Sequence, residues 1–169
     1  MTDQVFALHV ATRNNLLTYL ENLTPEQLAQ IPSGFHNSIW WNIVHCVATQ
    51  QILCYRLSGV KPVVSDDFID TYKKGTYPDG HIPTADEIQE LRSLLISTQK
   101  QLQADYERGV FSNFTPYTTS YGYALICIED AIHFNNTHEG MHLGVVIALN
   151  YFAKRRQFAD QHCRLIEAR

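Results

Sequence analysis

Residues 125–152 read LICIEDAIHFNNTHEGMHLGVVIALNYF. Apolar side chains, interrupted by one asparagine and two histidines, recur in this segment at steps of three and four residues. That spacing places them on one face of an α-helix. The face consists of Leu125, Ile128, Ile132, Asn135, His138, His142, Val145, Leu149 and Phe152. The pattern predicts a long helix from about Tyr121 to Ala153.

The same periodicity occurs in three earlier segments, residues 5–22, 39–57 and 84–107. Two connections rich in helix-breaking residues, 60–83 and 108–120, follow the second and third of these segments. The chain has no run of alternating β-branched residues that is long enough to form a sheet. The sequence therefore predicts an all-α protein, a four-helix bundle with two long connections.

The length and charge of the chain limit its organisation and its partners. A chain of 169 residues and 19.4 kDa fits one domain, which we expect over residues 1–153. A more polar extension follows over 154–169, for which the sequence leaves open a trailing helix or a frayed tail. The net charge is −4 and the isoelectric point is about 6.0, which argues against a nucleic-acid partner because such proteins need a basic face. No apolar run approaches the roughly 20 residues that span a bilayer, so we expect no membrane partner.

The chain has four cysteines, and none of them forms a Cys-x-x-Cys pair: Cys46, Cys54, Cys127 and Cys163. Most lie in apolar surroundings, which is typical of buried free thiols in a reducing compartment. We therefore expect a cytoplasmic protein.

His138 and His142 interrupt the apolar face of the last helix. An i, i+4 pair is separated by about 40° around a helix, so both imidazoles can point at one ion. Two neutral imidazoles in a core need polar partners, and a divalent metal satisfies both at once. The alternative for the pair alone is hydrogen bonding to side chains or water.

The same residues satisfy the H-E-x-x-H pattern of zinc metalloproteases, in which Glu139 would be the general base. The longer form of that motif requires Gly at position 145 and His at position 148, where this chain has Val145 and Ala148. A downstream carboxylate ligand would have to be Glu167, close to the C-terminus. Glu139 is thus a weak catalytic candidate, and we do not expect a metalloprotease.

His45 supplies a third candidate ligand from the helix over residues 39–57. It lies on a stripe that consists of Trp41, His45, Ala48, Ile52 and Tyr55, so it can face inward beside the last helix. Three histidines from two facing helices, with one coordination position left open, match a catalytic rather than a structural zinc-type site. The remaining histidines of the chain fit the site less well: His9, His36, His81, His133 and His162.

Residues 37–45, 57–59 and 135–144 resemble the second and fourth helices of the DinB-like (damage-inducible) superfamily. The segments occur in the right order, and the layout of helices and long loops covers nearly the whole chain. The resemblance implies a four-helix bundle, often dimeric, in which one histidine of the second helix and an H-x-x-x-H pair of the fourth bind a divalent metal. Those ligand roles would fall to His45, His138 and His142, with Glu139 at a variable position.

The resemblance also implies a reaction class. Characterised members of that family include thiol-dependent S-transferases and isomerases, so we expect a metal-dependent enzyme that transfers a low-molecular-weight thiol to a small-molecule substrate. Three imidazoles suit several divalent metals, of which we expect Zn or Ni. A metal-assisted hydrolase and a non-catalytic metal- or ligand-binding protein are the alternatives. A cleft beside an open coordination position would favour the enzyme, whereas a sealed site would favour the binding protein.

The resemblance and the aromatic-rich connections also lead us to expect a homodimer, since aromatic residues are enriched in interfaces. Gly140 and Gly144 form a small-residue patch on the side of the last helix opposite His142. This patch can pack against another helix of the bundle or against a second subunit, and the sequence leaves both open.

Overall fold

The computed structural model describes the backbone of residues 3–167 and the side chains of residues 3–153, and it confirms the all-α prediction. Its elements are α1 (Asp3–Asn22), α2 (Pro25–Ala29), α3 (Ile39–Gln50), the π-helix η1 (Gln51–Arg56), α4 (Asp66–Tyr72), α5 (Ala85–Glu107), β1 (Tyr117–Thr118), β2 (Ala124–Leu125) and α6 (Ile128–Glu167). None of the described helices is long and apolar enough to cross a membrane.

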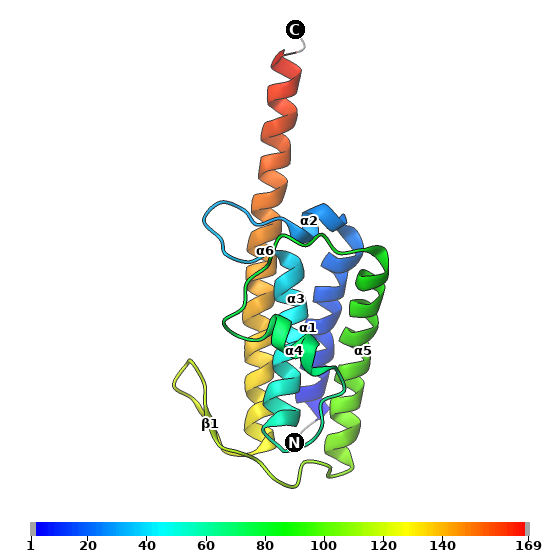
Figure 1. Cartoon of the computed structure of the whole chain (residues 1–169), viewed down its shortest axis with the longest axis vertical. Coiled ribbons are helices and arrows are strands. Elements are labelled where there is room, and N and C mark those ends of the chain that lie inside the picture. Colours follow the sequence, from blue (N-terminus) through cyan, green and yellow to red (C-terminus); the bar gives the residue numbers. More distant parts are fainter. Residues whose placement is uncertain (1–2, 168–169) are drawn as a thin grey trace.

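Four long helices form the bundle: α1, α3 with its continuation η1, α5 and α6 (Figure 1). Helix α6 packs against α1 and α3, and α5 packs against the same two helices. Figure 1 shows that α1 and α6 run in one direction along the bundle while α3 and α5 run in the other. Because α3 and α5 are parallel, the chain between them must return along the length of the bundle, which accounts for the length of the 60–83 connection.

The 60–83 connection contains a short helix, α4, which the sequence analysis did not predict. Its start is fixed by Ser65, whose hydroxyl accepts a hydrogen bond from the backbone N–H of Phe68. Asp66 and Asp67 follow in the first turn, where negative charge is favourable. Ile69 is fully buried and anchors α4 to the bundle.

The last helix begins at Ile128, and the predicted start near Tyr121 was wrong. The residues before it form a two-stranded antiparallel hairpin in which Tyr117 pairs with Leu125. Gly122 adopts a φ of 76° in the turn of this hairpin, a conformation that ends any helix there. Leu125 is nevertheless fully buried, so its assignment to the core was correct although its backbone is extended.

Helix α6 continues without a break past Ala153 to Glu167, so the predicted end of the helix at residue 153 was wrong. Figure 1 shows its last turns projecting beyond the other helices of the bundle. The side chains of the expected extension over 154–169, with His162 and Cys163, lie outside the described residues.

The core has two apolar clusters, one toward each end of the bundle. The first contains Leu16, Leu20, Ile39, Ile43, Leu91, Leu95, Val146 and Leu149. The second contains Phe6, Leu53, Tyr55, Leu102, Leu125, Ile128 and Ile132. On all four helices the residues between these clusters include buried polar side chains, among them Arg13, Gln50, Thr98 and Glu139. A polar layer therefore crosses the middle of the bundle.

Gly140 and Gly144 lie on an exposed part of α6. A Cβ atom added to either glycine would meet no atom within 4 Å. The proposal that these glycines let another helix of the bundle approach closely was therefore wrong, and their face remains open.

Candidate metal centre

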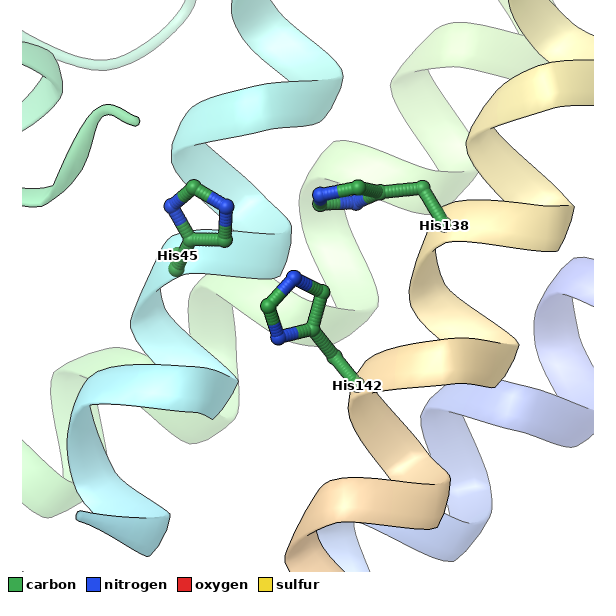
Figure 2. Close-up of side chains that lie close together, drawn as sticks. All are labelled: His45, His138 and His142. Atoms are coloured by element: carbon green, nitrogen blue, oxygen red, sulfur yellow. The ribbon is translucent and has the colours of Figure 1, made fainter. Parts of the chain in front are cut away.

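His45 from α3 and the pair His138 and His142 from α6 come together at one place in the bundle. One ring nitrogen of each residue lies within 4.8 Å of the others. The ring centroids are 4.8 Å apart for His45 and His142, 5.1 Å for His45 and His138, and 4.5 Å for His138 and His142. Figure 2 shows the three imidazoles directed into the space between the two helices. These three residues are called the histidine cluster below.

The local sequence explains how α3 delivers His45. Ser38 caps the helix by accepting a hydrogen bond from the backbone N–H of Trp41. Almost every side chain of α3 is buried, so the helix is fixed by neighbours on several sides. The indole of Trp41 stacks on the His45 ring at a centroid distance of 4.5 Å and an interplanar angle of 13°. This contact limits rotation of the imidazole.

Hydrogen bonding fixes the tautomer of His45, and with it the ring nitrogen that keeps a lone pair. Nδ1 of His45 lies 2.6 Å from the backbone carbonyl oxygen of Tyr72, at the C-terminal end of α4. A carbonyl oxygen can only accept, so Nδ1 carries the hydrogen and Nε2 of the neutral ring keeps its lone pair. The hydroxyl of Thr49 donates a hydrogen bond of 3.2 Å to the lone pair of that Nε2 atom.

The partner of His142 is Asn42, one turn before His45 on α3. Asn42 donates its amide N–H to the carbonyl oxygen of Ser38 at 2.7 Å, so its Oδ1 atom faces the imidazole. Nδ1 of His142 lies 2.7 Å from that oxygen and must donate, which again leaves Nε2 with the free lone pair. A hydrogen bond to the far nitrogen of a ligating histidine is the usual support of such ligands.

All three imidazoles are held neutral. Burial lowers the pKa of His138 to about 4, with a further contribution from His45. Burial and the neighbouring rings of His138 and His45 lower the pKa of His142 to about 3. Burial also lowers the pKa of His45, although its bond to Tyr72 opposes the shift. Metal ligation requires the unprotonated ring, so the cluster is in its ligating form at neutral pH.

One further observation supports a fit to a metal ion. Nδ1 of His138 is buried and has no hydrogen-bond partner among the described residues. An unpartnered polar atom in a protein interior is costly, by roughly 1–3 kcal/mol, and calls for an explanation. Three neutral imidazoles with converging nitrogens form a donor set that suits a divalent transition metal. The residues present thus fit such an ion.

The histidine cluster lies at the wall of a cavity of about 400 Å³. The cavity is also lined by Trp41 and Thr49 of α3, by Phe134 of α6 and by residues of the 74–77 and 117–121 segments. Pockets of this size hold small molecules. The cluster is therefore reachable from a space in which a small ligand fits.

Glu139 does not face the histidine cluster. Its carboxylate is fully buried on another side of α6 and accepts two hydrogen bonds from the guanidinium of Arg13, at 2.7 and 2.8 Å. His9 and Asn135 donate to the same group at 3.0 and 2.9 Å. Burial opposes ionisation of Glu139, but Arg13 and His9 outweigh it and hold its pKa below the usual range. Glu139 is thus part of the polar layer, engaged on both oxygens.

The structure also places the other candidates of the sequence analysis. His9 is buried against Glu139, and His133 is exposed on α6. His36 is exposed in a loop, and His81 pairs at the surface with Glu87. The described cysteines lie apart from the histidine cluster as free thiols, and burial raises the pKa of both Cys46 and Cys54.

Three residues that organise this region were not predicted from the sequence. Arg13 follows His9 by four residues, and that spacing on the buried face of α1 was a usable signal. Asn42 precedes His45 by three residues on α3, so it also lies on the same side of its helix. The hydrogen bond from His45 to Tyr72 uses a backbone carbonyl, which every residue type has, so the sequence contains no signal for it.

Two comparisons with known proteins bear on the identity of the chain. A comparison with curated proteins finds no match. A family model described as the DinB superfamily matches residues 8–146, a span that contains most of α1, all of α3 and α5, and the whole histidine cluster. Because the match covers most of the sequence and the fold is an all-α bundle, the chain belongs to the DinB superfamily.

Proposed function

We propose that this protein is a metal-dependent enzyme that transfers a low-molecular-weight thiol to a small-molecule substrate. His45, His138 and His142 would hold a divalent ion, with Zn or Ni the expected metals. When bound, such an ion lowers the pKa of a thiol or a water molecule and so supplies a nucleophile at neutral pH. The observation that carries the proposal is the convergence of three neutral imidazoles at the wall of a cavity.

The surrounding residues have supporting roles in this proposal. Asn42 and the carbonyl of Tyr72 hold His142 and His45 in the tautomers that present Nε2 to the ion. The hydroxyl of Thr49 donates to Nε2 of His45 at 3.2 Å, and an ion that took this lone pair would free the hydroxyl to donate to a ligand at the open position. The walls of the cavity orient the substrate and exclude water from the reacting atoms.

The cavity favours an enzyme over a storage or structural metal site. A site without turnover would be closed around its ion, as structural zinc sites are. The histidine cluster instead borders a space of about 400 Å³. Metal-assisted hydrolysis would use the same residues with water as the nucleophile, and it is the second candidate. We propose no peptidase activity, because Glu139 is engaged with Arg13 and turned away from the cluster.

The test is turnover of an electrophile with and without a thiol. Metal-loaded protein is incubated with L-cysteine and 1-chloro-2,4-dinitrobenzene. The thiol sulfur forms the new bond to carbon, chloride leaves with the bonding electron pair, and the thiol proton passes to the solvent. We expect metal-dependent turnover that a chelator abolishes and that re-addition of metal restores.

Two controls sharpen this test. His133→Ala removes an exposed histidine of α6 and should leave turnover unchanged, whereas His142→Ala should abolish it. Metal-dependent hydrolysis of an activated ester without any thiol, together with no thiol transfer, would replace the transferase by the hydrolase. Metal binding without either reaction would reduce the protein to a binding module.

We further propose that the protein acts as a cytoplasmic homodimer, with residues 1–153 as its catalytic domain. The exposed faces of Gly140 and Gly144 support the dimer, since small residues let a second backbone approach closely. Aromatic side chains of the connections add to this support, and Tyr77 and Tyr117 are exposed.

A further inference from the structure

We propose that the cavity beside the histidine cluster selects a small anion with an apolar body, and that Lys74 recognises its charge. The inference rests on the proposed metal centre and specifies the class of ligand that the centre receives. Three features of the cavity carry it: the charges of its lining, the position of Lys74 and the character of its walls.

The lining of the cavity contains no carboxylate among the described residues. The histidine cluster offers three imidazoles, which ligate a metal as neutral rings, so the two positive charges of a divalent ion would remain uncompensated by protein ligands. Lys74 is the one lysine or arginine that lines the cavity in the described part of the chain, and it adds a third positive charge. A cavity with this balance attracts anions and repels cations.

Lys74 is held at the cavity by a defined turn. The carbonyl of Lys73 accepts hydrogen bonds from both the backbone N–H and the hydroxyl of Thr76, at 3.2 and 2.9 Å. Gly75 has a φ of 93°, a conformation that favours glycine in such turns. The turn follows directly on Tyr72, whose backbone carbonyl accepts a hydrogen bond from His45. The turn that carries Lys74 is thus tied directly to the histidine cluster.

The two neighbouring lysines of this turn have different surroundings. Lys73 forms an ion pair with Asp70 at 3.0 Å and does not line the cavity. Lys74 lines the cavity and has no ion pair within the described part of the chain. Its charge is therefore available to a ligand, whereas the charge of Lys73 is already compensated.

The remaining walls are largely apolar. The apolar and aromatic side chains of the lining include Trp41, Leu53, Phe134, Met141 and Tyr121. Such walls favour a ligand that buries a hydrocarbon or aromatic body beside the cluster. The preferred ligand therefore has a donor atom for the ion, an apolar body and an anionic group for Lys74.

Three short thiols test the charge preference, because they differ mainly in their second group. Isothermal titration calorimetry measures binding of 3-mercaptopropionate, 2-mercaptoethanol and cysteamine to Zn²⁺-loaded protein. We expect the anionic thiol to bind most tightly and the cationic thiol most weakly. A fourth probe, 4-mercaptophenylacetate, keeps the carboxylate and adds a ring, and it should bind about tenfold more tightly than 3-mercaptopropionate.

Lys74→Met keeps the hydrocarbon stem and removes the charge. This substitution should lower the affinity for 3-mercaptopropionate by about fivefold, because an exposed ion pair contributes little binding energy. The affinity for 2-mercaptoethanol should stay unchanged. Lys73→Met is the matched control and should change neither affinity. Elemental analysis should find the same zinc content in both variants and in the unaltered protein.

Equal affinities for the three short thiols, or equal losses in the two lysine variants, would overturn the assignment of Lys74 while leaving the metal centre intact. An unaltered protein that holds no zinc would instead overturn the proposed function on which the inference rests. The two failures are therefore distinguished by the zinc analysis.

Discussion

Asn42 is the residue whose side chain most directly supports the histidine cluster. It holds His142 through a hydrogen bond of 2.7 Å while its own amide group is anchored to the backbone of Ser38. Asn42→Ala should weaken metal binding about 10- to 100-fold, because the ring loses the partner that sets its tautomer. Competition with a chelator of known affinity measures the change.

The control for this prediction is Asn136→Ala. Asn136 donates to the carbonyl of Val5 and does not touch the cluster, so its loss should leave the metal affinity unchanged. Equal metal affinities of the Asn42→Ala variant and the unaltered protein would remove Asn42 from the support of the site.

Glu139 has a structural role at the residue scale. Glu139→Gln would leave the buried charge of Arg13 without its partner, a change that costs about 3–5 kcal/mol of unfolding free energy. We expect this loss in urea denaturation, with the metal content per folded chain retained. Glu107→Gln, at an exposed position of α5, is the control for loss of one carboxylate. An unfolding free energy equal to that of the unaltered protein would contradict the role of the Arg13–Glu139 pair.

The three histidines could be predicted from the sequence because helical spacing alone brings His138 and His142 to one face. The inward stripe of α3 then added His45. Their partners were not predicted, since the bond between His45 and the Tyr72 carbonyl depends on where α4 docks. For Glu139 the local motif was misleading. The motif matched a general base, whereas the fold pairs Glu139 with Arg13, 126 positions away in sequence.

At the scale of elements, the long helices followed from periodicity. Thr84 and Glu87 form a capping box at the start of α5 in the structure, where the predicted 84–107 segment begins. Helix α4 was missed because its seven residues are too few for a periodic pattern. The start of α6 was placed too early because Leu125 continues the apolar spacing although it lies in β2.

Asp105 joins α5 to η1 and makes this contact sensitive to pH. Its carboxylate accepts a hydrogen bond from the Tyr55 hydroxyl at 2.7 Å and another from Gln101. Burial opposes its ionisation, but hydrogen bonds from Gln101, Tyr55 and Arg108 prevail and lower its pKa. The stabilisation by ionised Asp105 is therefore present above about pH 4 and is lost as the pH falls through the lowered pKa.

Asp105→Asn tests this contact. The variant should be less stable than the unaltered protein at pH 6, and the difference in unfolding free energy should shrink below pH 4. Urea denaturation across this range measures it. A difference that stays constant with pH would show that the charge of Asp105 contributes nothing to the contact.

At the scale of the whole molecule, the histidine cluster lies at the level of the polar layer. The apolar clusters on either side of that layer supply the packing of the bundle. The crossover between α3 and α5 places the end of α4 against His45 and residues 74–77 at the wall of the cavity. The 60–83 connection thus closes one side of the site. The sequence predicted this segment only as a long connection.

The proposed homodimer is tested at the same scale. Light scattering at micromolar concentration should give about twice the chain mass of 19.4 kDa, since a closed two-fold pair is the commonest homo-oligomer. If the exposed small-residue face of α6 is the interface, Gly144→Arg should give the monomer mass. A monomer mass for the unaltered protein over a hundredfold concentration range would exclude the dimer.

The central claim is that His45, His138 and His142 share one metal ion. Elemental analysis of protein purified without an affinity tag tests it most directly, with His133→Ala as the control from the exposed side of α6. We predict one divalent ion per chain in the unaltered protein and in the control, and well below one after replacement of any cluster histidine by alanine. Full metal content in His45→Ala would contradict the claim.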